Sequence, residues 1–536
     1  MKRGLSLLVV GLAMGITAAQ LAAQAASDPA VDHKTAEKCS VCHTKLQTAS
    51  GQPASIEQDW SASAMANAAR DPYWQGSVRR ETVEHPEIAP AIENECASCH
   101  MPLQHLRDQE AGHATAVFTH LPLGPSQAAA ADGVTCTVCH QMQPAGLGTE
   151  ASYNGNFTVA GSDAHPRTLY GPFDSAAAAK MHAAVTGYTL AQSPHIRDSA
   201  LCGSCHTLFT TSYGPGGKVI GKLPEQMPYV EWLHSSYKDK QSCQQCHMPA
   251  VDGAMAVSSL AGQPRDGARR HTFAGANFLL ADMLSAHGTD LGAAASGAAL
   301  DTASQQIRTL LASQAARLTV TPATGEHGAI AFAVKVENLT GHKLPTAFPS
   351  RSAWLHVTIT AADGKVVFES GKLNADGSIA GNSNDADPTR FSPHYTRITN
   401  PDEVQIFEPI LGTTDGKVTT GLLQATGYLK DNRILPAGFD KTTAPPEIAV
   451  HGQALDDPSF KGGESTTVYA VSSSGAAGPF HVAAELVYQP VGFRWAHNLA
   501  PVKADETQRF VKLYDEQAAR SSAVLAKAEE QIDAGK

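Results

Sequence analysis

The stretch ECASCHMPLQH (Glu95–His105) places two cysteines three positions apart and a histidine directly after the second. The same arrangement recurs along the chain and accounts for all ten cysteines of its 536 residues. The five copies are Cys39-Cys42-His43, Cys96-Cys99-His100, Cys136-Cys139-His140, Cys202-Cys205-His206 and Cys243-Cys246-His247. A pattern that leaves no cysteine over indicates one chemistry repeated five times.

Cys-x-x-Cys-His is the pattern of covalent c-type haem attachment. The two thiols add to the two vinyl groups of one haem, and the adjoining imidazole binds its iron. Zinc sites, thioredoxin-like redox pairs and disulfides also use closely spaced cysteines, but none of them needs a histidine at the next position. The ten cysteines and five motif histidines are therefore predicted to hold five haems.

Residues 1–25 have the pattern of a signal peptide, with a basic start (Lys2, Arg3), an apolar stretch (Leu5–Ile16) and small residues ending at Ala25. An uncleaved anchor is the alternative, although the apolar stretch is short for a membrane span. No later segment is apolar enough to span a bilayer. The protein is predicted to be periplasmic, or exported beyond the outer membrane, after cleavage.

The formal net charge of −11 gives no indication of nucleic-acid binding. An acidic surface favours encounter with cationic redox protein partners, and it also serves solubility. The oligomeric state is left open by these patterns.

The predicted fold class is α+β. The motifs end at His247 and are too closely spaced for each haem to have its own apolar core, which predicts a helical, loop-rich pentahaem domain over 26–300. Alternating, β-branched segments then predict an antiparallel β-sandwich with a connecting helix over 301–500. A C-terminal helix is expected within 501–536. The expected strands are 329–338, 353–370 (a hairpin turning at ADGK), 465–471 and 480–490.

Several expectations concern single helices. The connecting helix is expected over 296–316 with Asp301 or Thr302 as its N-cap. A helical insertion is expected near 421–430, and an amphipathic helix over 503–532 with the apolar stripe Phe510, Leu513, Leu525 and Ile532. Shorter helices are expected over 62–70, 175–185 and 229–237.

The second axial position of each haem iron decides its function. A histidine or methionine there makes an iron that passes electrons, and an open position makes an iron that binds substrate. The chain has 23 histidines, so the histidines that could bind iron outnumber the axial positions to be filled. His182 and His195 precede the fourth motif, and His271 follows the fifth beside three arginines. His105 lies too near His100 to reach the same haem easily, so it would cap a neighbouring one.

The phrases NECASCHMP, GVTCTVCHQ, MHAAVTGYTLAQSPHIRDSALCGSCHTL and CQQCHMP, within about 35–280, resemble multihaem cytochromes of the c-552/c-554 kind. That family shares a haem-packing core with hydroxylamine oxidoreductase and the pentahaem nitrite reductases. The resemblance implies multihaem electron transfer, with His105, His182, His195 and His271 as distal ligands. Related proteins often have a histidine where this chain has Met65, which is either a ligand or a core methionine.

A second resemblance concerns ENLTGHKLPTAFPSR and YLKDNRILPAGFDK, which are similar to β-sandwich segments attached to some exported multihaem cytochromes. His342, in the first phrase, either reaches a haem or its propionate or stabilises its own loop. Asp385 and Asp387, with Glu408, are candidates for calcium, but their spacing matches no EF-hand. A loop built on Asx turns is the alternative.

The predicted function is electron transfer between redox partners by an exported pentahaem c-type cytochrome. A multihaem oxidoreductase with one open haem, acting on a small nitrogen or sulfur compound, is one alternative. The CK-type haem motif of the nitrite reductases is absent, and we identify no crosslinking tyrosine of the hydroxylamine oxidoreductase type. A structural component of an extracellular electron conduit is a second alternative.

Overall fold

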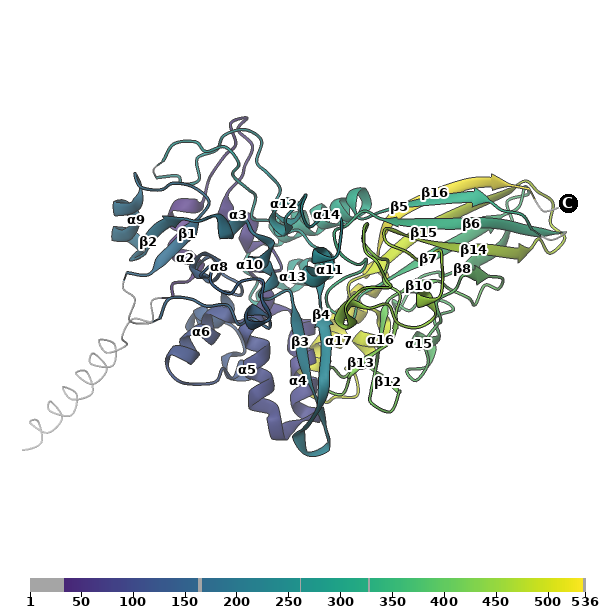
Figure 1. Ribbon diagram of the computed structural model, residues 1–536, viewed down its shortest axis with the longest axis horizontal. Coiled ribbons are helices and arrows are strands. Elements are labelled where there is room, and N and C mark those ends of the chain that lie inside the picture. Colours follow the sequence, from purple (N-terminus) through teal and green to yellow (C-terminus); the bar gives the residue numbers. More distant parts are fainter. Residues whose placement is uncertain (1–32, 162–165, 261, 326–327, 534–536) are drawn as a thin grey trace, which may run out of the picture.

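The computed structural model describes residues 33–161, 166–260, 262–325 and 328–533, so the predicted signal peptide lies outside the described residues. Figure 1 shows a helical, loop-rich N-terminal half on the left and a β-rich C-terminal half on the right. In the part of the chain that the structure describes, no helix combines the length and apolar composition needed to cross a bilayer.

Short helices dominate the N-terminal half. They are α2 (Ala36–His43), α3 (Ile56–Ser61), α4 (Pro72–Glu84), α5 (Ala89–His100), α6 (Pro102–Glu110), α7 (Ala128–Ala131), α8 (Cys136–Gln141), α9 (Ala179–Thr186), α10 (Ser199–Gly203), α11 (Pro228–Leu233) and α12 (Cys243–His247). Two small sheets, not foreseen from the sequence, complete this half. They are the parallel pair β1 (Thr168–Gly171) and β2 (Thr189–Gln192), and the antiparallel hairpin β3 (Leu208–Gly214) and β4 (Lys218–Gln226).

The helix expected over 62–70 is wrong for most of its length. Helix α3 ends at Ser61, and only Ala68–Arg70 forms a 3-10 turn before α4 begins at Pro72. Asp71 is the N-cap of α4, because its carboxylate accepts the backbone N–H of Tyr73 at 2.8 Å, and proline suits the first helical position. The expected helices 175–185 and 229–237 correspond to α9 and to the shorter α11.

Two helices, α13 (Phe278–Leu291) and α14 (Gly297–Gln314), join the halves. The expected connecting helix is confirmed, but its N-cap is Ser296, whose hydroxyl accepts the N–H of Ala299. Asp301 lies inside the helix and accepts a hydrogen bond from the Ser285 hydroxyl at 2.6 Å. The helix therefore spans nearly the whole expected range, and only its N-cap lies earlier than expected, at Ser296.

The C-terminal half holds the expected sandwich. One sheet has the order β10-β7-β15-β16, with β8 paired to β7, and the other has the order β5-β6-β14-β9. All pairs are antiparallel except β14 with β9. The strands are β5 (Ala316–Pro322), β6 (Ala329–Asn338), β7 (Ser352–Thr360), β8 (Val366–Ser370), β9 (Arg397–Ile398), β10 (Ile406–Phe407), β14 (Glu464–Ser472), β15 (Phe480–Gln489) and β16 (Ala523–Ile532).

One helix prediction in this half is wrong, and a second is confirmed only for the first part of its length. Instead of a helical insertion near 421–430, the chain turns and forms β13 (Gly427–Asp431), which joins β11 (Pro409–Gly412) and β12 (Val418–Thr419) in a small sheet. The helix expected over 503–532 is present as α17 (Asp505–Gln517) but ends there, after which β16 pairs with β15 along its length. All four residues of the expected stripe are buried, two from the helix and two from the strand. The burial of these four side chains was thus predicted correctly. The segment after Gln517 is a strand because it pairs with the edge of β15.

The halves pack closely through α17 (Asp505–Gln517), which lies against α4. Gly76 faces this contact, since a Cβ added there would lie 3.3 Å from the Leu499 side chain and 3.4 Å from the carbonyl oxygen of Glu506. The Arg79 guanidinium binds the Glu506 carboxylate at 2.8 Å. A second contact joins the β3–β4 hairpin to the C-terminal half, where Tyr213 N–H donates to the Leu423 carbonyl at 2.6 Å.

Candidate functional site

Helical turns arrange the five Cys-x-x-Cys-His motifs. Cysteines at positions i and i+3 and a histidine at i+4 share one face of a helical turn, which α2, α5, α8 and α12 contain in full. In four motifs the histidine Nδ1–H donates to a backbone carbonyl. These bonds are His43 to Val257 (2.6 Å), His100 to Ala68 (3.1 Å), His140 to Tyr170 (2.6 Å) and His247 to Ala274 (2.6 Å). Such bonds fix the tautomer and leave Nε2 to bind a metal.

Burial lowers the pKa of four motif histidines, His43, His100, His140 and His206. It lowers the pKa of His100 and of His206 to about 4, so both carry an unprotonated nitrogen at pH 7. A neutral imidazole is the form that binds iron. None of the ten cysteines forms a disulfide. These residues therefore fit covalent haem at every motif.

The motifs are clustered in space. Cysteine thiols of different motifs lie close enough to interact in three pairs, namely Cys39 with Cys136, Cys99 with Cys205, and Cys202 with Cys243. Cys139 of the third motif also lies close enough to Cys202 and Cys205 of the fourth to interact with both electrostatically. The motifs thus follow one another from the first to the third to the fourth, and the fourth also contacts the second and the fifth.

His342 faces the fifth motif. Its ring lies 6.4 Å from that of His247, centroid to centroid, and the two planes differ by only 14°. Two imidazoles that bind one metal ion from opposite sides, each through a bond of about 2.0 Å, have centroids roughly 6.3 Å apart. The Nδ1–H of His342 donates to the Lys343 carbonyl at 2.9 Å, which leaves its Nε2 available. The pair therefore has the separation that bis-histidine ligation requires.

His271 and His182 lie near the first and third motifs. Burial, with a smaller contribution from His140, lowers the pKa of His271 to about 4, and His271 also interacts with His43. Its Nδ1–H donates to the Arg269 carbonyl at 3.1 Å. His182 is close enough to His43 to contribute to its lowered pKa, whose main cause is burial. The structure thus brings two predicted ligands to the motifs that contact each other through Cys39.

His195 and His105 are placed differently. His195 interacts with His140, but its two ring nitrogens contact the Ser193 hydroxyl at 2.6 Å and the Met142 carbonyl at 2.9 Å. The ring would have to give up the Met142 contact to bind iron through Nε2. His105 is buried, with its Nδ1 3.4 Å from the Thr115 hydroxyl.

Met65 is partly buried in an apolar cluster that includes Leu103 and Val138, together with the motif residues Cys139 and Cys202. This packing is what a core methionine makes, at a place adjoining the third and fourth motifs. Both interpretations of Met65 remain compatible with its position.

The loop proposed for calcium is held by its own contacts. The Asp387 carboxylate accepts the N–H of Thr389 at 2.9 Å, as in an Asx turn, and Glu408 binds the buried ammonium of Lys430 at 2.9 Å. Asp385 accepts the N–H of Ile379 at 2.8 Å. Among the residues that the structure describes, these carboxylates do not gather into a three-ligand group. Asp387 thus forms an Asx turn, whereas Asp385 lies close enough to Glu408 to interact with it, and calcium binding at this loop stays a prediction.

Sequence reasoning missed a buried charge network that anchors His342. The Lys343 ammonium binds Asp431 at 2.6 Å, and the Arg433 guanidinium binds Asp431 at 2.7 Å and Glu231 at 3.2 Å. The Lys343 N–H also donates to Glu231, which belongs to α11. All four side chains are at most 4% exposed. The phrases GHKLPT and KDNR contain three of these residues, but nothing in the sequence indicates that they meet.

Among solved structures, this chain is similar to a penta-heme cytochrome c552 from Thermochromatium tepidum, with a TM-score of 0.50 and 17% sequence identity. The match covers 94% of this chain and 99% of that chain, so it includes both halves. At 17% sequence identity, the similarity shows that the two chains share a fold and shows nothing further. No protein-family model matches the sequence, and no curated protein matches it.

Proposed function

We propose that this chain is a pentahaem c-type cytochrome that carries electrons between redox proteins. The observation that carries the proposal is the clustering of all five Cys-x-x-Cys-His motifs, whose thiols meet across motif boundaries. Haems attached at neighbouring thiols would lie side by side, as electron hopping requires. The haems would supply the one-electron chemistry, while the chain supplies ligands, burial and spacing.

The chain's own residues fit that role. The motif histidines would bind iron on one side through Nε2, and Nδ1 hydrogen bonds would hold four of them in place. His342 would fill the sixth position of the fifth haem, and the β-sandwich would thereby complete the haem array. His271 and His182 are the proposed distal ligands at the first and third haems. A filled sixth position favours electron transfer over substrate binding.

Export and partner choice complete the proposal. The signal-peptide pattern predicted over residues 1–25 supports export to the periplasm or beyond the outer membrane, and c-type haems are attached outside the cytoplasm. The excess of acidic residues, with a formal charge of −11, supports encounter with cationic redox proteins. Such encounters slow as ionic strength rises.

Haem counting tests the proposal. The exported protein is denatured, and its haems are counted by pyridine haemochrome and by intact mass. The proposal predicts five haems that remain covalently bound. A matched variant, Cys243→Ser with Cys246→Ser, should lose one haem and keep four. A protein that binds zinc at its cysteines, or holds fewer than five haems after coexpression with the attachment machinery, would contradict the proposal.

A further inference from the structure

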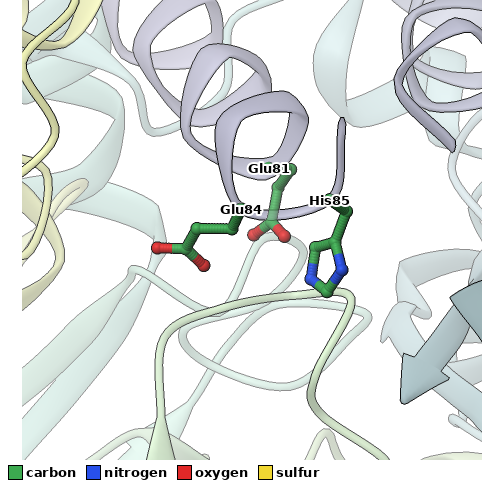
Figure 2. Close-up of side chains that lie close together, drawn as sticks. All are labelled: Glu81, Glu84 and His85. Carbon is green, nitrogen blue, oxygen red and sulfur yellow. The ribbon is translucent and has the colours of Figure 1, made fainter. Parts of the chain in front are cut away.

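A cluster outside the haem motifs lies at the C-terminal end of α4. Ligand atoms of Glu81, Glu84 and His85 lie within 4.8 Å of one another. The spacing i, i+3 and i+4 brings the three residues to one side of the helix end, and Figure 2 shows the Glu81 carboxylate between Glu84 and His85. None of the three belongs to a haem motif.

His85 is the residue that calls for an explanation. The residue is only 8% exposed, and its Nε2 is buried without a hydrogen-bond partner among the described residues. A buried polar atom without a partner has lost its hydration and gained nothing in return, so native structures rarely keep one unless an ion or a water satisfies it. In Figure 2 the imidazole lies beside the Glu81 carboxylate.

The carboxylates of Glu81 and Glu84 accept hydrogen bonds from the C-terminal half and still have lone pairs that could bind a cation. Glu81 is buried and accepts the N–H groups of Leu422 and Leu423, while Glu84 accepts hydrogen bonds from Arg80 at 2.9 Å and from the Gln424 amide at 3.3 Å. An ionised carboxylate has about four lone-pair sites, so these contacts leave some free.

We propose that Glu81, Glu84 and His85 bind a divalent cation of the zinc class. One imidazole nitrogen and two carboxylate oxygens make a three-ligand protein set, with water in the fourth position. Calcium and magnesium take all-oxygen sets, so the buried nitrogen selects against them. Because Glu81 and Glu84 also hold residues 422–424, the cation would fasten α4 to the C-terminal half. This inference is independent of the haem-binding proposal.

The experiment uses the purified haem-loaded protein after dialysis against a chelator. Zinc is titrated by calorimetry, and zinc and iron are then counted in the same sample by mass spectrometry. We expect one zinc per chain in the wild type, and loss of that zinc in His85→Ala with the iron content unchanged. Glu84→Gln, which alters an exposed side chain and should not disturb folding, should weaken zinc binding at least tenfold. Glu87→Gln, on the exposed turn after the cluster, is the matched control and should bind like the wild type.

Two results would overturn the inference. One is a wild type that takes up no zinc, or a zinc stoichiometry and affinity that are the same in the wild type, His85→Ala and Glu84→Gln. The other is a changed low-spin haem EPR spectrum in His85→Ala with zinc binding unaltered, which would assign the imidazole to an iron. Because iron is counted separately, a failure of the haem proposal would appear as a low iron content and not as a zinc result.

Discussion

Replacing Asp431 with asparagine should destabilise the protein strongly, because it breaks the buried charge network that anchors His342. Asp431 is 1% exposed and binds the ammonium of Lys343, which is fully buried, and the guanidinium of Arg433. Burial opposes ionisation of Asp431, but these two cations outweigh burial and hold its pKa well below the usual range. Removing this charge leaves two buried cations that face only the Glu231 carboxylate.

The expected loss follows from that imbalance. Breaking a buried ion pair by removing one partner costs about 3–5 kcal/mol, which corresponds to a change of about 10²- to 10⁴-fold in the folding equilibrium. Urea unfolding of the haem-loaded protein, followed by far-UV circular dichroism, measures this loss. Because the pKa of Asp431 is depressed in the folded state, its contribution is complete above about pH 4 and disappears as the pH falls further.

A matched control separates the buried network from an ordinary ion pair. Asp415 binds Lys417 at the same 2.6 Å N···O distance, but both side chains are more than half exposed. Asp415→Asn should leave the unfolding midpoint unchanged within error, because exposed pairs contribute little. A free energy of unfolding for Asp431→Asn within about 1 kcal/mol of the wild type would refute the reasoning.

Three further predictions follow from the same structure. His342→Ala should convert one low-spin ferric haem to a high-spin signal in low-temperature EPR, and an unchanged spectrum would show that His342 does not bind iron. Burial raises the pKa of Glu225 to about 7, so its ionisation costs the folded state stability as the pH rises from about 4. Glu225→Gln should therefore be more stable than the wild type by about 3 kcal/mol at pH 8 and equal to it below pH 4, as urea unfolding at both pH values will report. If Glu225→Gln were stabilised by the same amount at both pH values, ionisation of Glu225 would not be the cause. If the acidic surface attracts its partner, the rate of haem reduction by a cationic cytochrome should fall steeply with salt in stopped-flow experiments. A rate that does not depend on salt would rule out this attraction.

The sequence predicted the local features that have a strict chemical spacing. The five motifs were found from spacing alone, and the strands at 329–338 and 465–471 from alternation, because each pattern lies in a few consecutive residues. The prediction of a helix over 503–532 was wrong beyond Gln517, because the conformation there depends on a distant segment. Leu525 and Ile532 are buried as expected, but a sheet edge contributed by β15 selects the strand there. Tertiary contact decided between two conformations that the apolar pattern allowed.

The arrangement of the site depended on contacts between distant segments. His342 was identified as a candidate from its phrase, but its partner His247 lies in another half of the chain and is brought opposite it only by folding. The anchor formed by Glu231 and Asp431 is likewise assembled from separate segments. The buried, unpartnered Nε2 of His85 is a property of packing, and the sequence gives no sign of it.

Low-temperature EPR of the oxidised, haem-loaded protein, with haem content fixed by pyridine haemochrome, tests the central claim most directly. The account predicts five haems per chain, all of them low-spin, because an electron carrier keeps every sixth iron position filled. A high-spin ferric signal from one haem of the wild type would reveal an open iron. That result would contradict the electron-carrier account and would favour an oxidoreductase.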